Sequence, residues 1–596
     1  MTANGPRARP GGVTSGKPPG RDPPYLPTGN RRHGPRRRTV RAVIQCPTHN
    51  DAIDGDTKRK QRNMPKHVAI VGCGFTGTTA FYQLVHGYPV ERITVFESSG
   101  DFGPGFPYKL DESSEYLLNN TNDTMCLEPT NRRAFVEWLQ RHPRYARGLD
   151  EKGNMPRAVY GEFLRDVILR TGAAAKERGI RVKLVPQEVV DLDEDEAGTV
   201  TLFTGEDAFE ADMAILAIGR CPDVDRFHLQ GFDGRSYFAT HMPGQKLDEI
   251  PLDAECHVIG ASLSAYDAVN QLFSAASGCE FVPDGKDRLR FVANGNDRRV
   301  VLCSRSGRLK KAQSRYPFPV DLQSLRDGHL EHAGRGTLTL ADLLRLMEHD
   351  ANAAGVHIDR AAMADPYAGI DDDESLNRRA AEILAADIDA ATSPPDSPDN
   401  YVVDYLDAAQ FELWDLFAAR VLSAEQEALF RAKYETAFLS YAAPCPVSTA
   451  QKVLALMDGG RLRIVGGVRS ISTDHDARAF RIEHRFGIEQ AHHIINATGA
   501  VDRNVDSTVQ PTLVRNLAEK GTLRPYRIGE DGGAKGIDVD MHTFAASPGG
   551  NVHVANMFLW GPGLYVSSAV MMATIVARVL ATAFARESAQ RSPSSH

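Results

Sequence analysis

The sequence predicts an α/β protein with two parallel sheets, because two similar units of strand, glycine turn and helix occur along the chain. The first unit starts with the β-branched segment His67 to Val71, and the second starts at His257. From about Leu338 to Lys433 the apolar residues instead follow helical spacing, with an acidic, proline-bearing interruption from Asp371 to Asn400. This stretch predicts an inserted helical subdomain.

The composition is typical of a soluble globular protein, with 42% hydrophobic and 24% charged residues. The net charge of -8 argues against a general nucleic-acid binder, which would need clustered Lys and Arg. No apolar leader is visible, so we expect a cytoplasmic location. The segment from Val566 to Ala585 is nearly uncharged, but we interpret it as a buried helix and expect no membrane association.

The eight cysteines are scattered along the chain, and none forms a CxxC pair. This spacing argues against a zinc site and against a redox dithiol, so no metal is expected. We expect the cysteines to be mostly buried small hydrophobic residues.

The first 64 residues are rich in Pro, Gly and Arg and lack an apolar period, which predicts a disordered basic tail. Three interpretations stay open for this tail. It binds an anionic partner, or it is a solvated tail without a role, or it reflects a misplaced start, since Met64 directly precedes the first strand.

The first glycine turn follows a strand and opens a helix, with the sequence Gly72-Cys73-Gly74-Phe75-Thr76-Gly77. A dinucleotide needs its pyrophosphate held by backbone N–H groups at a helix N-terminus, and glycines allow that close approach. Glu97 ends the next strand about 20 residues onward, where an acid binds ribose hydroxyls. We therefore predict that Gly72, Gly74, Phe75, Thr76, Gly77 and Glu97 bind a dinucleotide.

The second turn is a degenerate version of the first, Gly260-Ala261-Ser262-Leu263-Ser264-Ala265, again between a strand and a helix. The following strand ends near Arg305 and Arg308, and arginine there suits the 2′-phosphate of NADP. A solvated basic turn is the alternative. We predict that NADPH contacts Gly260, Ser262, Ser264, Arg305 and Arg308, and we assign the first turn to FAD, because chains with two such units normally hold the flavin first.

Further glycines and amides mark candidate flavin contacts. Gly219 and Gly499 end apolar strands, and Gly561-Pro562-Gly563, if followed by a helix, would aim N–H groups at the pyrimidine end of the flavin; a plain helix start is the alternative. The loop after Leu118 offers candidate catalytic groups that face the flavin, namely Asn119, Asn120, Asn122 and Asp123. The alternative is an Asx-rich turn that satisfies its own backbone.

From Lys66 to about Ala585 the chain resembles FAD/NAD(P)-binding proteins related to flavin-dependent N-hydroxylating monooxygenases. The resemblance rests on five segments: Gly103 to Tyr108, Leu117 to Asn119, Pro156 to Leu164, Leu216 to Gly219 and Asn496 to Gly499. Within that family it is most similar to bacterial aspartate N-monooxygenases, which make nitrosuccinate in natural-product biosynthesis.

The resemblance implies that NADPH reduces FAD, that O2 forms a C4a-hydroperoxyflavin, and that the nitrogen of a small amino acid is oxidised. A dicarboxylic substrate would need cations, for which Lys109, Arg315 and Arg503 are candidates, with ordinary surface charges as the alternative. Two other functions stay open: a sulfur or Baeyer-Villiger oxygenase, and a non-catalytic FAD-binding redox sensor.

The predicted domain division follows from these motifs. It comprises the tail (1–64), an FAD-binding domain in two parts (65–235 and 436–590), a nested NADPH-binding domain (236–335) and the helical insert (336–435).

Overall fold

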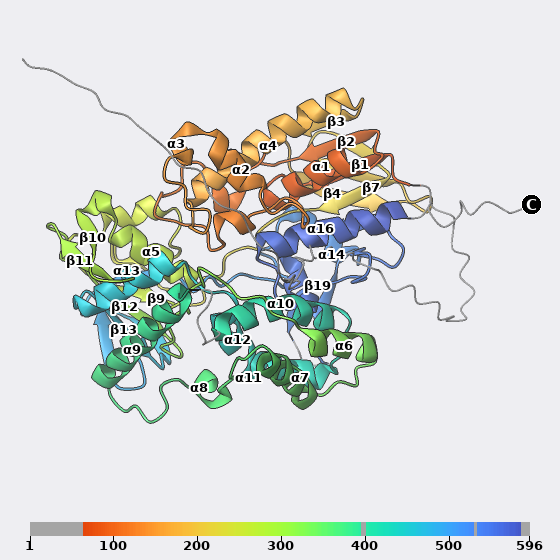
Figure 1. Cartoon of the computed structure of the whole chain (residues 1–596). Helices are drawn as coiled ribbons and strands as arrows, with labels where there is room; N and C mark the ends of the chain where they lie inside the picture. The colour runs from red at the N-terminus through yellow and green to blue at the C-terminus, as the bar shows by residue number, and fades with distance from the viewer. Residues whose placement is uncertain (1–63, 395–400, 530–532, 586–596) are drawn as a thin grey trace, which may run out of the picture. The chain divides into compact units, whose positions relative to one another are not determined.

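The computed structural model describes residues 64–394, 401–529 and 533–585. All of the predicted basic tail except Met64 lies outside these residues. The described chain is mixed α/β and contains two five-stranded parallel sheets, which confirms the predicted fold class (Figure 1).

The first sheet is entirely parallel, and its neighbouring strands are far apart in sequence. Its order is β20 (Val552–Val554), β7 (Met213–Leu216), β1 (His67–Val71), β2 (Arg92–Phe96) and β3 (Arg181–Val185). Buried Val and Ile side chains on both faces of β1 are expected of a central parallel strand.

Three helices lie against one another along this sheet, and in Figure 1 they run side by side: α4 (Arg157–Glu177), α1 (Phe75–Gly87) and α16 (Ala569–Phe584). The predicted buried helix is α16, whose residues are mostly buried. Among the described residues, no helix has the length and apolar character needed to cross a bilayer.

Smaller elements complete this half. An antiparallel sheet, whose apolar residues join the same core, contains β4 (Val189–Glu194), β5 (Val200–Thr204) and β6 (Ala208–Ala211). The remaining elements are α2 (Ala134–Arg141), α3 (Pro143–Ala146), α14 (Thr512–Glu519), β18 (Arg524–Arg527), β19 (Ala534–Asp538) and α15 (Trp560–Gly563).

The second sheet is also parallel, with the order β13 (Leu462–Gly466), β12 (Arg299–Ser304), β9 (Glu255–Ile259), β17 (His493–Asn496) and β8 (Tyr237–Phe238). The predicted division places residues 436–590 with the first sheet, whereas β13 and β17 complete the second. This occurs because parallel neighbours need crossover connections, and here the crossovers are long.

Helices α5 (Leu263–Leu272), α13 (Val447–Asp458) and α9 (Asp373–Thr392) pack in that order beside the second sheet. Helix α9 corrects the sequence analysis, which expected a break in the helices from Asp371. Asp373 and Glu374 form the first turn of the helix, while Leu376, Leu384 and Ile388 are buried, together with Asp387. Residues 395–400 lie outside the described part.

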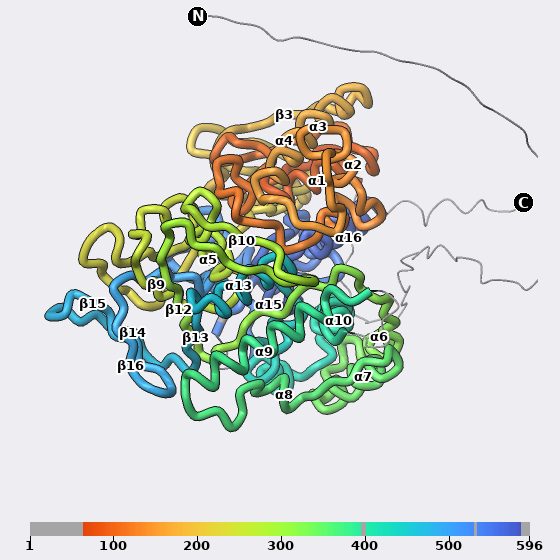
Figure 2. Tube along the Cα trace, turned by 60° about the vertical axis from the view of Figure 1, so that its left-hand side comes forward, coloured from red at the N-terminus to blue at the C-terminus, as the bar shows by residue number. Residues whose placement is uncertain are grey.

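Two antiparallel elements extend this half. One is the hairpin of β10 (Cys279–Pro283) and β11 (Leu289–Ala293). The other is the three-stranded ribbon that lies at the left of Figure 2, formed by β14 (Ser470–Asp474), β15 (Ala479–Glu483) and β16 (Ile488–Ala491).

The other helices of the insert form a core of their own. They are α6 (Gln323–His332), α7 (Leu340–Ala353), α8 (Arg360–Ala364), α10 (Val402–Ala418), α11 (Ala424–Lys433) and α12 (Glu435–Ala442). Helix α10 is the central member and also contacts α15 near the C-terminus, which lies in the part of the molecule built on the first sheet.

Candidate functional site

The first glycine turn lies at the carboxyl end of β1, beside the end of β2. Val71 pairs with Phe96, and the Gly72 N–H donates to the Phe96 carbonyl at 2.9 Å. A Cβ on Gly72, whose φ is +94°, would lie 2.4 Å from the Ala217 carbonyl oxygen. A Cβ on Gly77 would lie 1.9 Å from the Gly72 carbonyl oxygen, so both positions require glycine.

The N-terminus of α1 has no side-chain cap, because its N-cap residue is Gly74. Glu97 stands beside this turn, and its Oε2 accepts the Cys73 N–H at 2.8 Å while its Oε1 accepts the Ser99 hydroxyl. A Cβ on Gly74 would come within 3.2 Å of Gly105. Bare N–H groups beside a carboxylate fit a pyrophosphate next to a ribose.

In the second turn, Gly260 stands at the end of β9 in the same position that Gly72 has at the end of β1. The Gly260 N–H donates to the Cys303 carbonyl at 2.8 Å, and a Cβ on Gly260 would lie 2.5 Å from the Ala497 carbonyl oxygen. Helix α5 likewise lacks a side-chain cap at its N-cap residue, Ser262. The residue that matches Glu97 in register is Ser304, directly followed by Arg305.

Residues 69–221 match a family whose description is FAD-NAD(P)-binding. The chain therefore contains an FAD/NAD(P)-binding domain. The matched residues include the whole first turn, Glu97 and the strand end at Gly219.

A curated relative, the uncharacterized protein YdhS of Escherichia coli strain K12, is 30% identical over 272 residues. That match covers 43% of this chain and 48% of YdhS, so the chain spans about half the length of the curated relative it matches.

Three solved structures resemble the chain weakly. The ornithine N-hydroxylase of Kutzneria sp. 744 is 14% identical, with a TM-score of 0.44 over 88% of this chain and 100% of that one. The L-lysine 6-monooxygenase of Pseudomonas syringae is 13% identical, with a TM-score of 0.45 over 88% and 100%. The cadaverine monooxygenase of Erwinia amylovora is 12% identical, with a TM-score of 0.48 over 90% and 100%.

The two predicted arginines of the second turn differ in their surroundings. Arg305 is exposed, and no ion pair holds it among the described residues. Arg308 instead donates from its guanidinium to the Met363 carbonyl at 2.5 Å and to the Ala364 carbonyl. Arg305 is therefore free for a ligand, while Arg308 anchors the end of α8.

In the amide loop after Leu118, some side chains are likewise held by contacts within the protein. Asn122 is buried, donates to the Asp150 carbonyl at 2.9 Å and accepts the Met155 N–H at 3.0 Å. Asp123 accepts from Thr121 at 2.7 Å and pairs with Lys152 at 2.6 Å. These two side chains thus hold the loop together, which is the behaviour that the Asx-turn alternative predicts.

The first two residues of that loop have other positions. Asn119 lines a small cavity together with Tyr266 and Asn270 of α5. Asn120 accepts the side-chain N–H of Asn154 at its own carbonyl, at 3.0 Å. Asn119 therefore lies beside helix α5, in a cavity of about 10 Å³ that has room for roughly one water molecule.

The glycines near the C-terminus are explained by close packing. A Cβ on Gly561 would lie 2.3 Å from the Lys535 carbonyl oxygen, and one on Gly563 would lie 2.2 Å from Trp414. Gly561 to Gly563 lie within the short helix α15, and the long helix that follows them, α16, begins at Ala569. Pro562 needs no N–H partner at this position, and α16 is capped instead by Ser568.

The other two predicted cofactor glycines end strands of different sheets. Gly219 follows β7 of the first sheet with φ +74°, and Gly499 follows β17 of the second with φ +61°. The chain segments that continue from them meet, because the Val224 N–H donates to the Ala500 carbonyl at 3.0 Å. Gly219 and Gly499 therefore lie where the two halves join.

The three predicted substrate cations have unlike environments. Lys109 is exposed and its ammonium lies 5.6 Å from the ring centre of Phe106. Arg315 pairs with Asp150 at 2.8 Å. Arg503 is half-buried, and its guanidinium stacks 4.4 Å from the ring centre of Trp560.

Arg503 has no carboxylate partner among the described residues, and its buried Nε has no hydrogen-bond acceptor. Burial lowers the pKa of its guanidinium. The nearby carboxylate of Glu435 is engaged by Arg431 at 3.2 Å and by Trp560 at 3.2 Å. Arg503 is thus a desolvated cation that lacks a counter-anion.

A buried ion pair between the two halves was not predicted. Arg157 lies in one of the segments that carry the family resemblance, and it pairs at 2.8 Å with Asp267 of α5. It also donates to the Leu117 carbonyl at 3.0 Å. Neither side chain is more than 12% exposed. The buried pair therefore holds α4, which lies along the first sheet, to α5, the helix that follows the second turn. The sequence offers no sign that these two residues meet.

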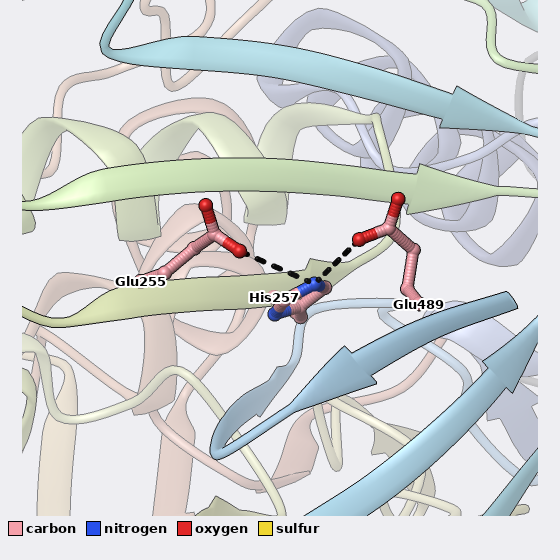
Figure 3. Close-up of side chains that lie close together, drawn as sticks. All are labelled: Glu255, His257 and Glu489. Carbon is pink, nitrogen blue, oxygen red and sulfur yellow. Dashed lines mark hydrogen bonds and ion pairs between the residues drawn. The ribbon is translucent and has the colours of Figure 1, made fainter.

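One group of side chains on the second sheet has the composition of a metal site, as Figure 3 shows. His257 Nε2 lies 3.5 Å from Glu489 and 4.0 Å from Glu255. However, Arg463 binds Glu489 through two hydrogen bonds, of 2.9 and 2.7 Å. Hydrogen bonds from His257 and Arg463 hold the pKa of Glu489 well below its usual range. The guanidinium already supplies the positive charge, so we interpret the group as an ion-pair network.

The seven cysteines in the described residues are all free and buried, as expected. Cys46 lies outside the described residues. Burial raises the pKa of Cys73, beside the first turn, to about 12, so it is not a reactive thiolate.

Proposed function

We propose that the chain is an FAD- and NADPH-dependent monooxygenase that N-oxidises a small amino acid, with L-aspartate as the first candidate. One observation carries the proposal: the two turns are alike in backbone but opposite in charge, with Glu97 at the first and Ser304 and Arg305 at the matching positions of the second. An acid suits a ribose, whereas an arginine without an acid suits a 2′-phosphate.

The proposed nucleotide pair favours an oxygenase over a dithiol reductase. All seven described cysteines are free, and burial raises the pKa of those beside the turns. Bound FAD reduced by NADPH would supply the electrons for oxygen activation. Arg503 supports an anionic substrate, because it is the half-buried cation without a counter-anion.

The test uses the purified flavin-loaded protein. NADPH, but not NADH at the same concentration, should bleach the flavin under anaerobic conditions. In air, L-aspartate should raise NADPH consumption and give an N-oxidised product in the mass spectrum. Bleaching without a product from any amino acid would point to a sulfur or Baeyer-Villiger oxygenase. No bleaching at all would overturn the proposal in favour of an FAD-binding sensor.

The role of Arg503 has its own variant. Arg503→Lys keeps the charge but loses the planar fork, and Arg503→Gln loses both. We expect the KM for the amino acid to rise in both variants, more in Arg503→Gln, while NADPH still bleaches the flavin at the wild-type rate. Arg315→Gln is the matched control, because Arg315 is held by Asp150.

A further inference from the structure

A cavity of about 300 Å³ lies between α1, α2 and α4, three helices that lie together in Figure 1. Its volume is at the lower end of the range for small-molecule sites, about 300 to 1,000 Å³. None of its lining residues belongs to either glycine turn. On α1 the lining begins at Tyr82, about 12 Å along the helix axis from Gly74 at roughly 1.5 Å per residue. The cavity is therefore separate from both predicted nucleotide sites.

The inner wall of the cavity is apolar. Leu127, Phe163 and Val167 form it, and none of them is more than 3% exposed. At one side the ring of Tyr82 lies 4.3 Å from the ring of His86, centre to centre. His86 donates from Nδ1 to the Tyr82 carbonyl at 2.8 Å, which fixes the orientation of its ring. This wall suits the hydrocarbon part of a ligand.

Two opposite charges of α2 stand at the rim of the cavity. Glu137 and Arg141 both line it, and both are exposed. They are one turn apart with the acid first, which is the favoured arrangement for an ion pair on a helix. Asp166 and Arg170 of α4 have the same spacing and do pair, at 3.0 Å. Glu137 and Arg141 form no ion pair with each other or with any other described residue, so the cavity has one free charge of each sign.

The charges around the Tyr82 hydroxyl show which part of the cavity attracts a cation. Burial raises the pKa of Tyr82, and the charges of Glu128 and Glu137 add to that rise, whereas Arg170 opposes it. Asp166 already pairs with Arg170, so the two acids determine the local charge. A cationic group is therefore favoured beside Glu137, and an anionic group beside Arg141, one turn further along α2.

We infer that this cavity binds a zwitterionic α-amino acid with an apolar side chain. Its carboxylate would accept hydrogen bonds from the Arg141 guanidinium, and its ammonium would donate to the Glu137 carboxylate. One carbon atom carries both charges of an α-amino acid, which fits two side chains one turn apart. The apolar side chain would lie against Leu127, Phe163 and Val167. The inference goes beyond the proposed function, because this ligand is bound outside the nucleotide sites and is not oxidised.

Other classes of small ligand fit the same charges less well. Glu137 would repel a simple carboxylic acid, and Arg141 would repel a simple amine. A dicarboxylic amino acid would bring a third charge against the apolar wall, where it has no partner. The cavity therefore distinguishes its ligand from L-aspartate, the first candidate for the reaction.

The cavity also contacts the chain that continues the amide loop. Gln83 of α1 donates from its side-chain amide to the Leu127 carbonyl at 2.8 Å and to the Ala573 carbonyl of α16 at 3.2 Å. Leu127 is thus held between two helices of the first half, a few residues after the loop that begins at Asn119. A ligand bound against Leu127 would lie next to this segment and not at the amides themselves.

The test measures binding of L-phenylalanine and L-leucine to the FAD-loaded full chain by calorimetry. Phenylpropionate, which lacks the ammonium, and phenethylamine, which lacks the carboxylate, are the comparison ligands. At least one of the amino acids should bind, and both comparison ligands should bind about tenfold more weakly or less. Glu137→Gln and Arg141→Gln should each weaken binding of the amino acid about tenfold. Arg147→Gln is the matched control and should leave the affinity unchanged, because Arg147 is exposed but does not line the cavity.

These three substitutions change exposed side chains, so the variants should fold as the wild type does, which melting curves check. A further variant, Ala134→Phe, places a ring in the cavity and should abolish binding with unchanged flavin content. The inference is overturned if neither amino acid binds, if a comparison ligand binds as tightly as L-phenylalanine, or if Glu137→Gln or Arg141→Gln keeps the wild-type affinity. Displacement of the bound amino acid by L-aspartate would also overturn it, since the ligand would then occupy the proposed substrate site.

Discussion

The turn at Gly72 and the turn at Gly260 share their first residue and differ at the positions that follow. In both, the first glycine N–H donates to the neighbouring strand, at 2.9 and 2.8 Å, and a Cβ would meet a backbone carbonyl at 2.4 and 2.5 Å. Five residues later the first turn has Gly77, with no room for a Cβ, whereas the second has Ala265, which is fully buried.

This difference shows that the two turns are under unlike steric constraints. Helix α1 approaches its own turn so closely that the Gly72 carbonyl excludes any side chain at position 77. Helix α5 leaves space for a methyl group at the equivalent place. A degenerate glycine pattern therefore need not weaken a nucleotide site, because only the first glycine is required at both turns.

The largest effect is expected for Gly77→Ala. Its Cβ would lie 1.9 Å from the Gly72 carbonyl oxygen, so the turn and α1 must separate. We expect loss of copurified FAD and a destabilisation on the order of 3 kcal/mol. Flavin absorbance and thermal melting check this. A variant that keeps its full flavin content would show that the turn is wider than the structure indicates.

The next effect is expected for Gly260→Ala, which places a Cβ 2.5 Å from the Ala497 carbonyl oxygen at a φ of +129°. FAD should stay bound, because the first turn is untouched, while anaerobic flavin reduction by NADPH should slow about tenfold or more. Rapid-mixing absorbance measures the rate. Loss of FAD with normal reduction of added flavin would reverse the assignment of the two turns.

A smaller and more selective effect is expected for Arg305→Ala. Removal of an unpaired arginine should raise the KM for NADPH about tenfold and leave the KM for NADH nearly unchanged. Arg308→Ala is the matched control. It should cost about 1 kcal/mol of stability, because Arg308 donates to the carbonyls of Met363 and Ala364, and it should not alter the nucleotide preference. If Arg305→Ala raised the KM for NADPH and the KM for NADH by the same factor, the predicted phosphate contact would be contradicted.

The smallest effect is expected for Ala265→Gly, which gives the second turn the third glycine of the first. A glycine inside α5 should lower stability by about 0.5–1 kcal/mol, and the KM for NADPH should stay within about twofold of the wild type. Melting curves and steady-state kinetics check both values. A clear gain in NADPH affinity would mean that the alanine, and not only the missing acid, shapes this site.

Several features of the site were predictable because they depend on neighbours in sequence. Gly72 and Gly260 each end a buried strand and start a helix, and such local patterns determine backbone shape without the rest of the chain. Other features depend on distant partners. The same loop contains Asn122, which holds the backbone of Met155, and Asn119, which lines a cavity beside α5, and their residue type does not distinguish them.

The sequence-based interpretations that the structure changed also depend on contacts with distant segments. The acidic stretch after Asp371 looked like a break, but it contains helix α9, because Leu376, Leu384 and Ile388 find a hydrophobic core beside the second sheet. Gly561 and Gly563 looked like a helix entrance, but Lys535 and Trp414 pack too closely against them for any side chain. In each case the deciding contact comes from a segment that the local pattern does not contain.

The sequence by itself determined the two parallel sheets, the two turns, and the acid at one turn against the arginine at the other. Only the tertiary structure decided which charges are neutralised: Asp415 meets Arg578 and Glu489 meets Arg463, while Asp404, Asp407 and Arg503 meet no opposite charge among the described residues. The physical reason is range. Backbone conformation depends on adjacent residues, whereas the Arg578 that neutralises Asp415 comes from 163 residues along the chain.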